Sequence, residues 1–205
     1  MTDKKNNLEL WNAVFETNPS HTSDFNKGYK GTAIKPYYVI QRATERWGAI
    51  GMAWRVIEVD RQIVNDCVYM KVRVETPEGS AEHWGGETLD NYKGTGPDDE
   101  AFKKAYTDAF MKALSLFGFS ADVHLNMFSD SKYKEYLDRK YEEENTKASI
   151  KRRLPDIDGA VSAIESQEGL DVFSILLERI WPLVEEKMPD YAEEINSRIE
   201  RKING

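Results

Sequence analysis

Basic and aromatic side chains alternate with apolar ones between Val68 and Val74, where the sequence reads Val-Tyr-Met-Lys-Val-Arg-Val. Successive side chains of a β-strand point to opposite faces of a sheet, so Tyr69, Lys71 and Arg73 would face outward together. A single nucleic-acid strand is held by cations along its backbone and by flat side chains on which its bases stack. The alternation therefore predicts a nucleic-acid-binding face, with a solvated sheet face as the alternative interpretation.

Two further groups extend this supply of cations and aromatic rings. Trp54-Arg55 and His83-Trp84 lie in segments that also have a strand-like pattern. Lys104, Asp108 and Lys112 follow one another at intervals of four residues, which places them on one side of a helix. The alternative for these three is an intrahelical ion-pair ladder worth roughly 0.3 kcal/mol per pair. The composition therefore suggests that the protein binds a polyanion.

Residues for covalent or metal-dependent catalysis are sparse. Cys67 has no histidine near it in sequence, and no Gly-x-Ser-x-Gly motif is present. Gly94-Thr95-Gly96 lacks the Lys-Ser/Thr pair of a phosphate-binding loop. The carboxylates Glu58, Asp60 and Glu75 could serve a metal-dependent nuclease, but no Glu-x-Lys or Asp-x-Lys follows on the next strand. We therefore expect a protein that is not an enzyme, with no metal ligand and no cofactor, and keep the nuclease as an alternative.

The net charge of −8 over 205 residues at first argues against a polyanion partner. Of the 36 acidic residues, 12 lie between Pro155 and Gly205, together with only 5 basic ones. The preceding 154 residues are nearly neutral, with a net charge of −1. Such a body can still carry a basic groove, because the local field rather than the net charge steers a polyanion.

The composition also limits the class of protein. A single cysteine permits no intrachain disulfide and no cysteine-cluster zinc site. No apolar run approaches the ~18 residues that span a bilayer, and the first residues form no apolar secretory segment. We therefore expect a protein of a reducing cytoplasm, without a membrane partner.

Three stretches can be distinguished along the chain. Residues 1–130 contain all of the strand-like sequence and are predicted to form an α+β DNA-binding domain. Residues 131–154 are highly charged and predict a connecting helix that frays toward Asn145. Residues 155–205 have apolar residues at helical spacing, interrupted by Pro182 and Pro189, and predict an acidic region of two or three short helices.

The order of elements in the first stretch can be read from turns and periodicity. Pro36 can open a helix that Gly48 ends, and the polar stretch Thr17–Thr32 shows little periodicity. A continuous apolar stripe predicts a long helix over Glu100–Phe117, ended by Gly118. Strands are predicted over Ala53–Val59, Ile63–Glu75 and Ser80–Thr88, with a turn at Pro77-Glu78-Gly79. The predicted fold class is α+β: a helix, a three-stranded antiparallel β-meander and a long helix, followed by a C-terminal helical tail.

Several motifs in this region resemble those of a known family. One runs from Val39-Ile40 through Ala43 to Trp47-Gly48, followed by Gly51 and Trp54; a second is the turn Glu78-Gly79-Ser80, followed by Glu82, Gly85 and Gly86; the third is the helix Lys104–Gly118. Together with the element order they resemble the Rad-fifty-two superfamily of single-strand annealing proteins, which includes phage Red-beta, RecT and Erf relatives. The resemblance covers about Lys35 to Phe128. Gly31–Pro36 and Phe119–Val123 also look like segments of short phage and prophage proteins.

The resemblance implies a phage recombination protein that forms a ring or a filament of identical subunits. Single-stranded DNA would lie in a positive groove with its bases presented for pairing, and no ATP would be used. Lys112 matches one of two consecutive basic positions that contact the DNA backbone in the family, and Met111 occupies the other. Ser115 replaces a further basic position, and Tyr38 stands where eukaryotic members have a groove arginine.

Other cations would have to supply the charge missing at these positions. The predicted DNA-binding residues are Lys35, Arg42, Arg46, Arg55, Lys71, Arg73, Lys104 and Lys112. The predicted base-stacking residues are Trp54, Tyr69 and Trp84.

The acidic tail allows two interpretations. It is either an autonomous helical cap or a docking site for a single-strand-binding protein or a companion exonuclease, as C-terminal helices often are in the family. Besides the nuclease, an acidic protein-binding adaptor with no affinity for DNA remains an alternative function for the whole chain.

Overall fold

The computed structural model describes residues 8–26, 28, 30–90, 96–154 and 180–204, together with scattered positions between 159 and 178. The chain divides into two units, Met1–Leu137 and Asp138–Gly205. The division falls inside helix α5 (Ser131–Arg153). Each unit has its own buried cluster and is described separately below.

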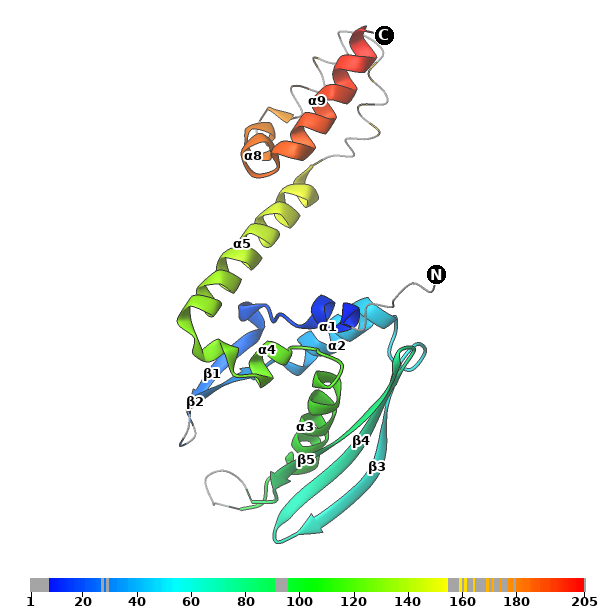
Figure 1. Cartoon of the computed structure of the whole chain (residues 1–205), viewed down its shortest axis with the longest axis vertical. Helices are drawn as coiled ribbons and strands as arrows, with labels where there is room; N and C mark the ends of the chain where they lie inside the picture. The colour runs from blue at the N-terminus through cyan, green and yellow to red at the C-terminus, as the bar shows by residue number, and fades with distance from the viewer. Residues whose placement is uncertain are drawn as a thin grey trace. The chain divides into compact units, whose positions relative to one another are not determined.

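A three-stranded antiparallel sheet forms the centre of the first unit (Figure 1). Its strands are β3 (Arg55–Val64), β4 (Cys67–Thr76) and β5 (Gly79–Thr88), hydrogen-bonded in that order. Helix α2 (Pro36–Trp47) precedes the sheet, and helix α3 (Ala101–Ser115) follows it and packs on β4 and β5. The predicted α+β fold, with a meander between two helices, is therefore confirmed.

The turn between the first two strands lies later than the sequence pattern suggested. We expected the second strand to begin at Ile63, whereas β3 continues to Val64 and β4 begins at Cys67. The turn is made by Asn65 and Asp66, whose φ angles are 48° and 59°. A two-residue hairpin turn of this kind requires positive φ at both positions, which Asn and Asp tolerate best after glycine. The Asn65-Asp66 pair indicated this turn, but the apolar residues Ile63 and Val64 just before it led us to begin the second strand too early.

Helix α3 lies unusually close to strand β5. A Cβ atom placed on Gly85 would lie 2.3 Å from the carbonyl oxygen of Ala105 and 2.3 Å from the amide nitrogen of Ala109. Because no side chain fits there, Gly85 and the two alanines allow the helix backbone to rest directly on the strand. This contact sets the distance between α3 and the sheet.

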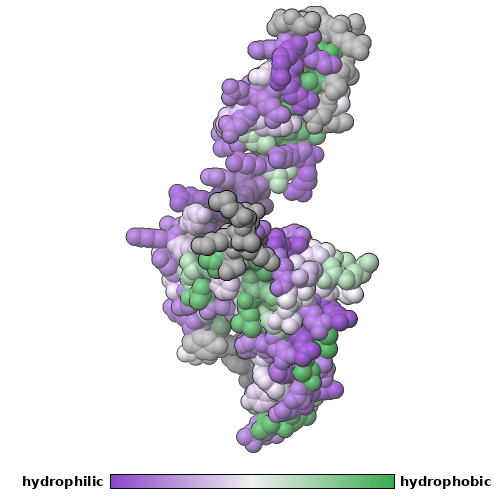
Figure 2. Space-filling model, turned by 45° about the vertical axis from the view of Figure 1, so that its right-hand side comes forward, coloured by the Kyte–Doolittle hydropathy of each residue, from purple (hydrophilic) through white to green (hydrophobic). Residues whose placement is uncertain are grey.

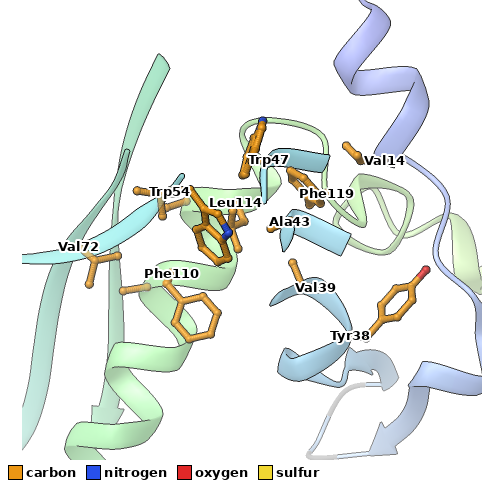
Figure 3. Packing of buried hydrophobic residues seen from close by; sticks show 13 residues of the cluster. Val14, Tyr38, Val39, Ala43, Trp47, Trp54, Val72, Phe110, Leu114 and Phe119 are labelled. Atoms are coloured by element: carbon orange, nitrogen blue, oxygen red, sulfur yellow. The ribbon is translucent and has the colours of Figure 1, made fainter. Parts of the chain in front are cut away.

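The main core of the first unit lies where α2, the sheet and α3 meet. Figure 3 shows Trp47 and Trp54 together with Phe110, Leu114 and Phe119 in this core. The Trp47 ring contacts Phe119 edge-on, with ring centroids 5.0 Å apart. The inner face of the sheet is completed by two valines of β4, Val72 and Val74, as the alternation of that strand predicts.

A second, two-stranded sheet was missed at the sequence level. Strands β1 (Thr22–Asn26) and β2 (Lys30–Ile34) form an antiparallel hairpin that lies mostly within Thr17–Thr32, the polar stretch in which we found little periodicity. The strands contain few apolar residues, so they lack the alternation by which a half-buried strand is recognised. Helix α1 (Glu9–Val14) and the 3-10 turn η1 (Pro19–His21) precede the hairpin.

The segment after α3 forms a short connector into α5. It consists of α4 (Ala121–His124) and the 3-10 turn η2 (Met127–Ser129). We expected the charged helix that follows to fray toward Asn145, but α5 continues without interruption to Arg153. Its charged residues have high helix propensity, which sustains a helix that buries little apolar surface.

The second unit is helical where the structure describes it. Helices α8 (Trp181–Lys187) and α9 (Pro189–Asn204) begin at or next to the two prolines that were expected to interrupt the tail. The core of this unit includes Val161, Ile164, Leu177, Val184 and Ile195. All of them except Val184 belong to the apolar residues at helical spacing from which the short helices of this region were predicted. Other residues with this spacing, Ile157, Leu170, Phe173 and Leu176, lie outside the described residues. Among the described helices, none is long and apolar enough to cross a membrane.

The surface of the first unit is mostly hydrophilic on the face seen in Figure 2, with small separate hydrophobic areas. One of these lies at the lower end of the unit, where Figure 1 places the turn between β3 and β4. Ile63 and Val64, which are 60% and 48% exposed, lie at this turn.

Candidate nucleic-acid interface

The outer face of the sheet carries the alternating residues that first suggested nucleic-acid binding. Tyr69, Lys71 and Arg73 of β4 point away from the core, while the apolar residues between them are buried. On β5, Trp84 lies opposite Lys71 and Glu82 lies opposite Arg73, so they share this face. Tyr69 and Trp84 are 40% and 37% exposed. The predicted stacking residues on this face are thus within reach of solvent.

The cations of this outer face are neutralised by neighbouring carboxylates. Arg73 pairs with Glu82 at 2.6 Å, and Lys71 pairs with the other oxygen of Glu82 at 2.6 Å. Arg55 pairs with Glu75 at 2.7 Å. Hydrogen bonds from Lys71 and then from Arg73 lower the pKa of Glu82, which keeps its charge in place. Each of these three cations is therefore held in an ion pair, so the outer face carries little net positive charge.

Trp54, by contrast, is not available for stacking on a base. The side chain is 2% exposed and belongs to the main core, and its Nε1 donates to the carbonyl oxygen of Gly48 at 3.1 Å. The prediction for Trp54 was wrong because the strand begins at Arg55, and the residue just before it turns into the gap between α2 and the sheet (Figure 3).

The predicted cations on and just before α2 bond to a carboxylate or to backbone carbonyl groups of neighbouring segments. The Arg46 guanidinium pairs with Glu78, which also accepts from the Trp47 indole at 2.8 Å. Arg42 donates to the carbonyl oxygen of Ala13 at 2.8 Å. Lys35 donates to the carbonyl oxygen of Ser20 at 2.9 Å. These three side chains tie α2 to the turn before β5 and to the N-terminal segment.

The two predicted lysines of α3 are paired as well. Lys112 forms the expected i,i+4 ion pair with Asp108 at 2.8 Å. Lys104 pairs instead with Asp98, in the loop before the helix. The hydrogen bond from Lys104 is the main cause that lowers the pKa of Asp98. The expected ion-pair ladder of Lys104, Asp108 and Lys112 is therefore only half formed. With these two lysines, all eight predicted cations have a bonding partner within the protein.

The structure reveals a different feature, a groove of about 1150 Å³ on the first unit, to which we refer as the α3 groove. One wall is the β1–β2 hairpin and the first turns of α2, and the other is α3 with α4. Its apolar lining includes Phe25, Tyr37, Tyr106, Phe110 and Met111, and its basic lining consists of Lys30, Lys103 and Lys104. Of the eight cations predicted from the sequence, Lys104 lines this groove directly, while Lys112 is paired with Asp108, which also lines it.

Each wall of the α3 groove is held by a local feature of the sequence. Gly31 in β2 leaves room for the ring of Phe25, since a Cβ there would lie 2.6 Å from that ring. On the other wall, Lys103 pairs with Glu100 one turn earlier. Lys30 has no ion pair with any residue that the structure describes. The lining of the groove thus combines aromatic rings with lysine side chains.

His124 lies in the same groove and adds no charge to it at neutral pH. Desolvation of the ring lowers the pKa of His124, and the positive charge of Lys112 lowers it further. The cations of the groove are therefore its lysines.

The carboxylates considered for a nuclease are not brought together. The bulge in β3 shifts the register so that Glu58 lies opposite the buried Val72, whereas Asp60 lies opposite the outward-facing Lys71. Glu75 lies at the other end of the strand pair, opposite Arg55. Within the described part of the chain, no cluster of three histidine, cysteine or acidic side chains could hold a metal ion. The positions of these carboxylates give no support to metal-dependent cleavage.

The groove residues Lys30, Tyr37 and Tyr106 were missed at the sequence level. Lys30 and Tyr37 flank the segment Gly31–Pro36, which we singled out only as a motif shared with phage proteins. That motif was the signal that could have found them, because its glycine and proline shape the hairpin and the start of α2.

Comparison with known proteins adds no identification. No protein-family model and no curated protein sequence matches this chain. The resemblance to the annealing superfamily therefore rests on the motifs and the element order described above.

Proposed function

We propose that this protein binds single-stranded DNA in the α3 groove and anneals complementary strands without ATP, as a homo-oligomer. The observation that carries the proposal is the composition of the groove, whose lining combines aromatic and apolar residues with three lysines. Bases of a single strand stack on aromatic rings while its phosphates contact amino groups. The groove volume of about 1150 Å³ lies just above the upper end of the roughly 300–1,000 Å³ range typical of small-molecule pockets.

The existing ion pairs do not oppose this function. Lys103 pairs with Glu100 at the surface, and such an exposed pair contributes about 0–1 kcal/mol. A phosphate can therefore replace the carboxylate at little cost. Each lysine that contacts a phosphate also releases condensed counterions, so the affinity should fall steeply as salt increases.

The site is tested by comparing two double variants in binding of a labelled oligonucleotide. Lys30→Ala with Lys104→Ala removes two cations of the groove, and Arg55→Ala with Arg73→Ala removes two cations of the outer sheet face. We expect the groove variant to bind about tenfold more weakly, with a slope of log affinity against log salt reduced by about 2. The sheet-face variant should bind like the native protein.

Either of two results would contradict this proposal. A loss confined to the sheet-face variant would move the site to Tyr69, Trp84 and their neighbours. A native protein that binds no single strand at any salt concentration would leave the acidic adaptor as the better interpretation.

Annealing needs its own measurement, since binding does not imply it. Two complementary oligonucleotides with a donor and an acceptor dye are mixed without any nucleotide, and energy transfer reports duplex formation. We expect the native protein to accelerate duplex formation, and the groove variant to do so less. Negative-stain images with and without DNA would show whether rings or filaments form.

A further inference from the structure

Tyr37 is the most exposed aromatic side chain among the described residues, at 83%. It stands in the first turn of α2, on the wall of the α3 groove. An aromatic ring left in water gives up the large gain from burying its apolar surface. Such exposure at the mouth of a groove therefore indicates a ring that is covered by a ligand rather than by the protein.

The neighbouring tyrosine shows what a structural role looks like at this place. Tyr38 is 7% exposed, and its hydroxyl accepts from the backbone N–H of Asn18 at 3.1 Å. Its ring also stacks on His21, with centroids 4.5 Å apart and planes 9° from parallel. Tyr37 has none of these contacts with the described residues. Tyr38 thus packs within the protein, whereas the Tyr37 side chain is exposed and lines the groove.

The backbone that carries Tyr37 is well fixed. Pro36 restricts φ at the first position of α2, and the preceding Lys35 bonds from its backbone N–H to the carbonyl oxygen of His21 at 2.9 Å. The backbone N–H of Tyr38 then bonds to the carbonyl oxygen of Lys35 at 3.0 Å. Because only the side-chain torsions of Tyr37 remain to be ordered, little entropy is lost when its ring contacts a ligand.

The chemistry of the other groove residues indicates which ligand would cover this ring. Lys30, Lys103 and Lys104 line the same groove and favour an anionic chain. A flat, unpaired base attached to such a chain can lie on the Tyr37 ring while its phosphates contact the lysines. The bases of a duplex are stacked on one another and do not offer a free face, so the same arrangement favours a single strand over a duplex.

We propose that Tyr37 stacks on an unpaired base of the bound strand and so makes the α3 groove selective for single-stranded nucleic acid. This inference rests on the proposed function, which it deepens by assigning the base contact to a residue outside the predicted set. In this proposal the base stacks on a residue at the start of α2 and not on the stacking residues predicted for the sheet.

The test compares Tyr37→Ala, Tyr37→Phe and Tyr69→Ala in binding to two oligonucleotides of equal length and charge. One oligonucleotide carries normal bases, and the other carries abasic sites throughout. We expect Tyr37→Ala to lower the affinity for the normal oligonucleotide about tenfold, but to leave the affinity for the abasic one unchanged. Tyr37→Phe keeps the ring and should bind like the native protein, as should Tyr69→Ala on the outer sheet face.

The outcomes separate this inference from the proposed function. If the native protein binds DNA and Tyr37→Ala binds it with the same affinity, the stacking role alone is overturned. An equal loss for both oligonucleotides would also overturn it, because the effect would then not depend on bases. Absence of any binding by the native protein would overturn both proposals. Since the Tyr37 side chain is 83% exposed, the two Tyr37 variants should have the same unfolding temperature as the native protein, and a melting curve checks this.

Discussion

At the scale of single residues, one buried carboxylate holds three parts of the first unit together. Asp122 is fully buried and accepts from the Thr17 backbone N–H at 2.8 Å and from the Thr17 hydroxyl at 2.6 Å. The Tyr133 hydroxyl also donates to it, at 3.0 Å. Asp122 thus joins the N-terminal segment, the short helix α4 and the start of α5. Asp122 belongs to the Phe119–Val123 motif, and these hydrogen bonds are its structural role there.

Asp122→Ala should lower the free energy of unfolding by about 3 kcal/mol, because it leaves buried donors without an acceptor. Tyr133→Phe removes one donor and leaves the other bonds in place, so it should cost only about 1 kcal/mol. Urea unfolding of both variants measures the difference. Equal costs would mean that Thr17 contributes nothing to the role of Asp122.

The cations belong to the same scale, and they show how a residue type differs from a site. Lys71 and Arg73 share one face as predicted, yet both pair with Glu82, and Arg55 on the neighbouring strand pairs with Glu75. Lys30 was not predicted but lines the α3 groove. Whether a lysine or an arginine can serve a polyanion depends on which carboxylates the fold places beside it.

At the scale of elements, the close contact between α3 and β5 positions one wall of the α3 groove. The helix rests on Gly85, where backbone atoms of Ala105 and Ala109 occupy the space of a side chain. At Gly86, the next residue, an added Cβ would lie 2.9 Å from the Tyr69 ring. A ring can rotate aside, whereas a helix backbone cannot.

Gly85→Ala should therefore destabilise the protein by about 3 kcal/mol, since the helix would have to move off the strand. Gly86→Ala is the matched control and should cost about 1 kcal/mol or less, because loss of chain entropy in the unfolded state partly offsets the displacement of Tyr69. Thermal and urea unfolding of the two variants compares the costs. A Gly85→Ala variant as stable as Gly86→Ala would contradict the close approach.

At the scale of the whole molecule, charge is divided unevenly along the chain. Residues 155–205 hold 12 acidic and 5 basic side chains, while residues 1–154 are nearly neutral. Negative charge on the same chain lowers the attraction of DNA over distances comparable to the Debye length, about 10 Å at 0.1 M salt. At low salt, where the Debye length reaches about 30 Å at 0.01 M, the acidic region should therefore weaken binding by the first unit.

A chain that ends at Leu154 should bind a single strand more tightly than the full chain at low salt, by about threefold. The difference should vanish at about 1 M salt, where the Debye length is about 3 Å. Salt-titrated anisotropy on both proteins measures this. A truncated chain that binds more weakly would show instead that residues 155–205 take part in binding.

The sequence by itself determined the elements whose signals are local. Alternation in β4, the apolar stripe of α3, and the proline and glycine that bound α2 each depend on a few neighbouring residues, and each predicted its element. The β1–β2 hairpin carried no such signal, because its polar strands lack the alternation of a half-buried sheet.

The tertiary structure alone decided which residues meet. Tyr37 and Lys104 are far apart in sequence and line one groove, and Trp54 turns into the core. Five of the eight predicted cations pair with carboxylates outside their own helix or strand. These outcomes depend on the register of strands and on the distance between a helix and a sheet. Periodicity tells which face of an element is buried, but not which element covers that face or which charges lie beside it.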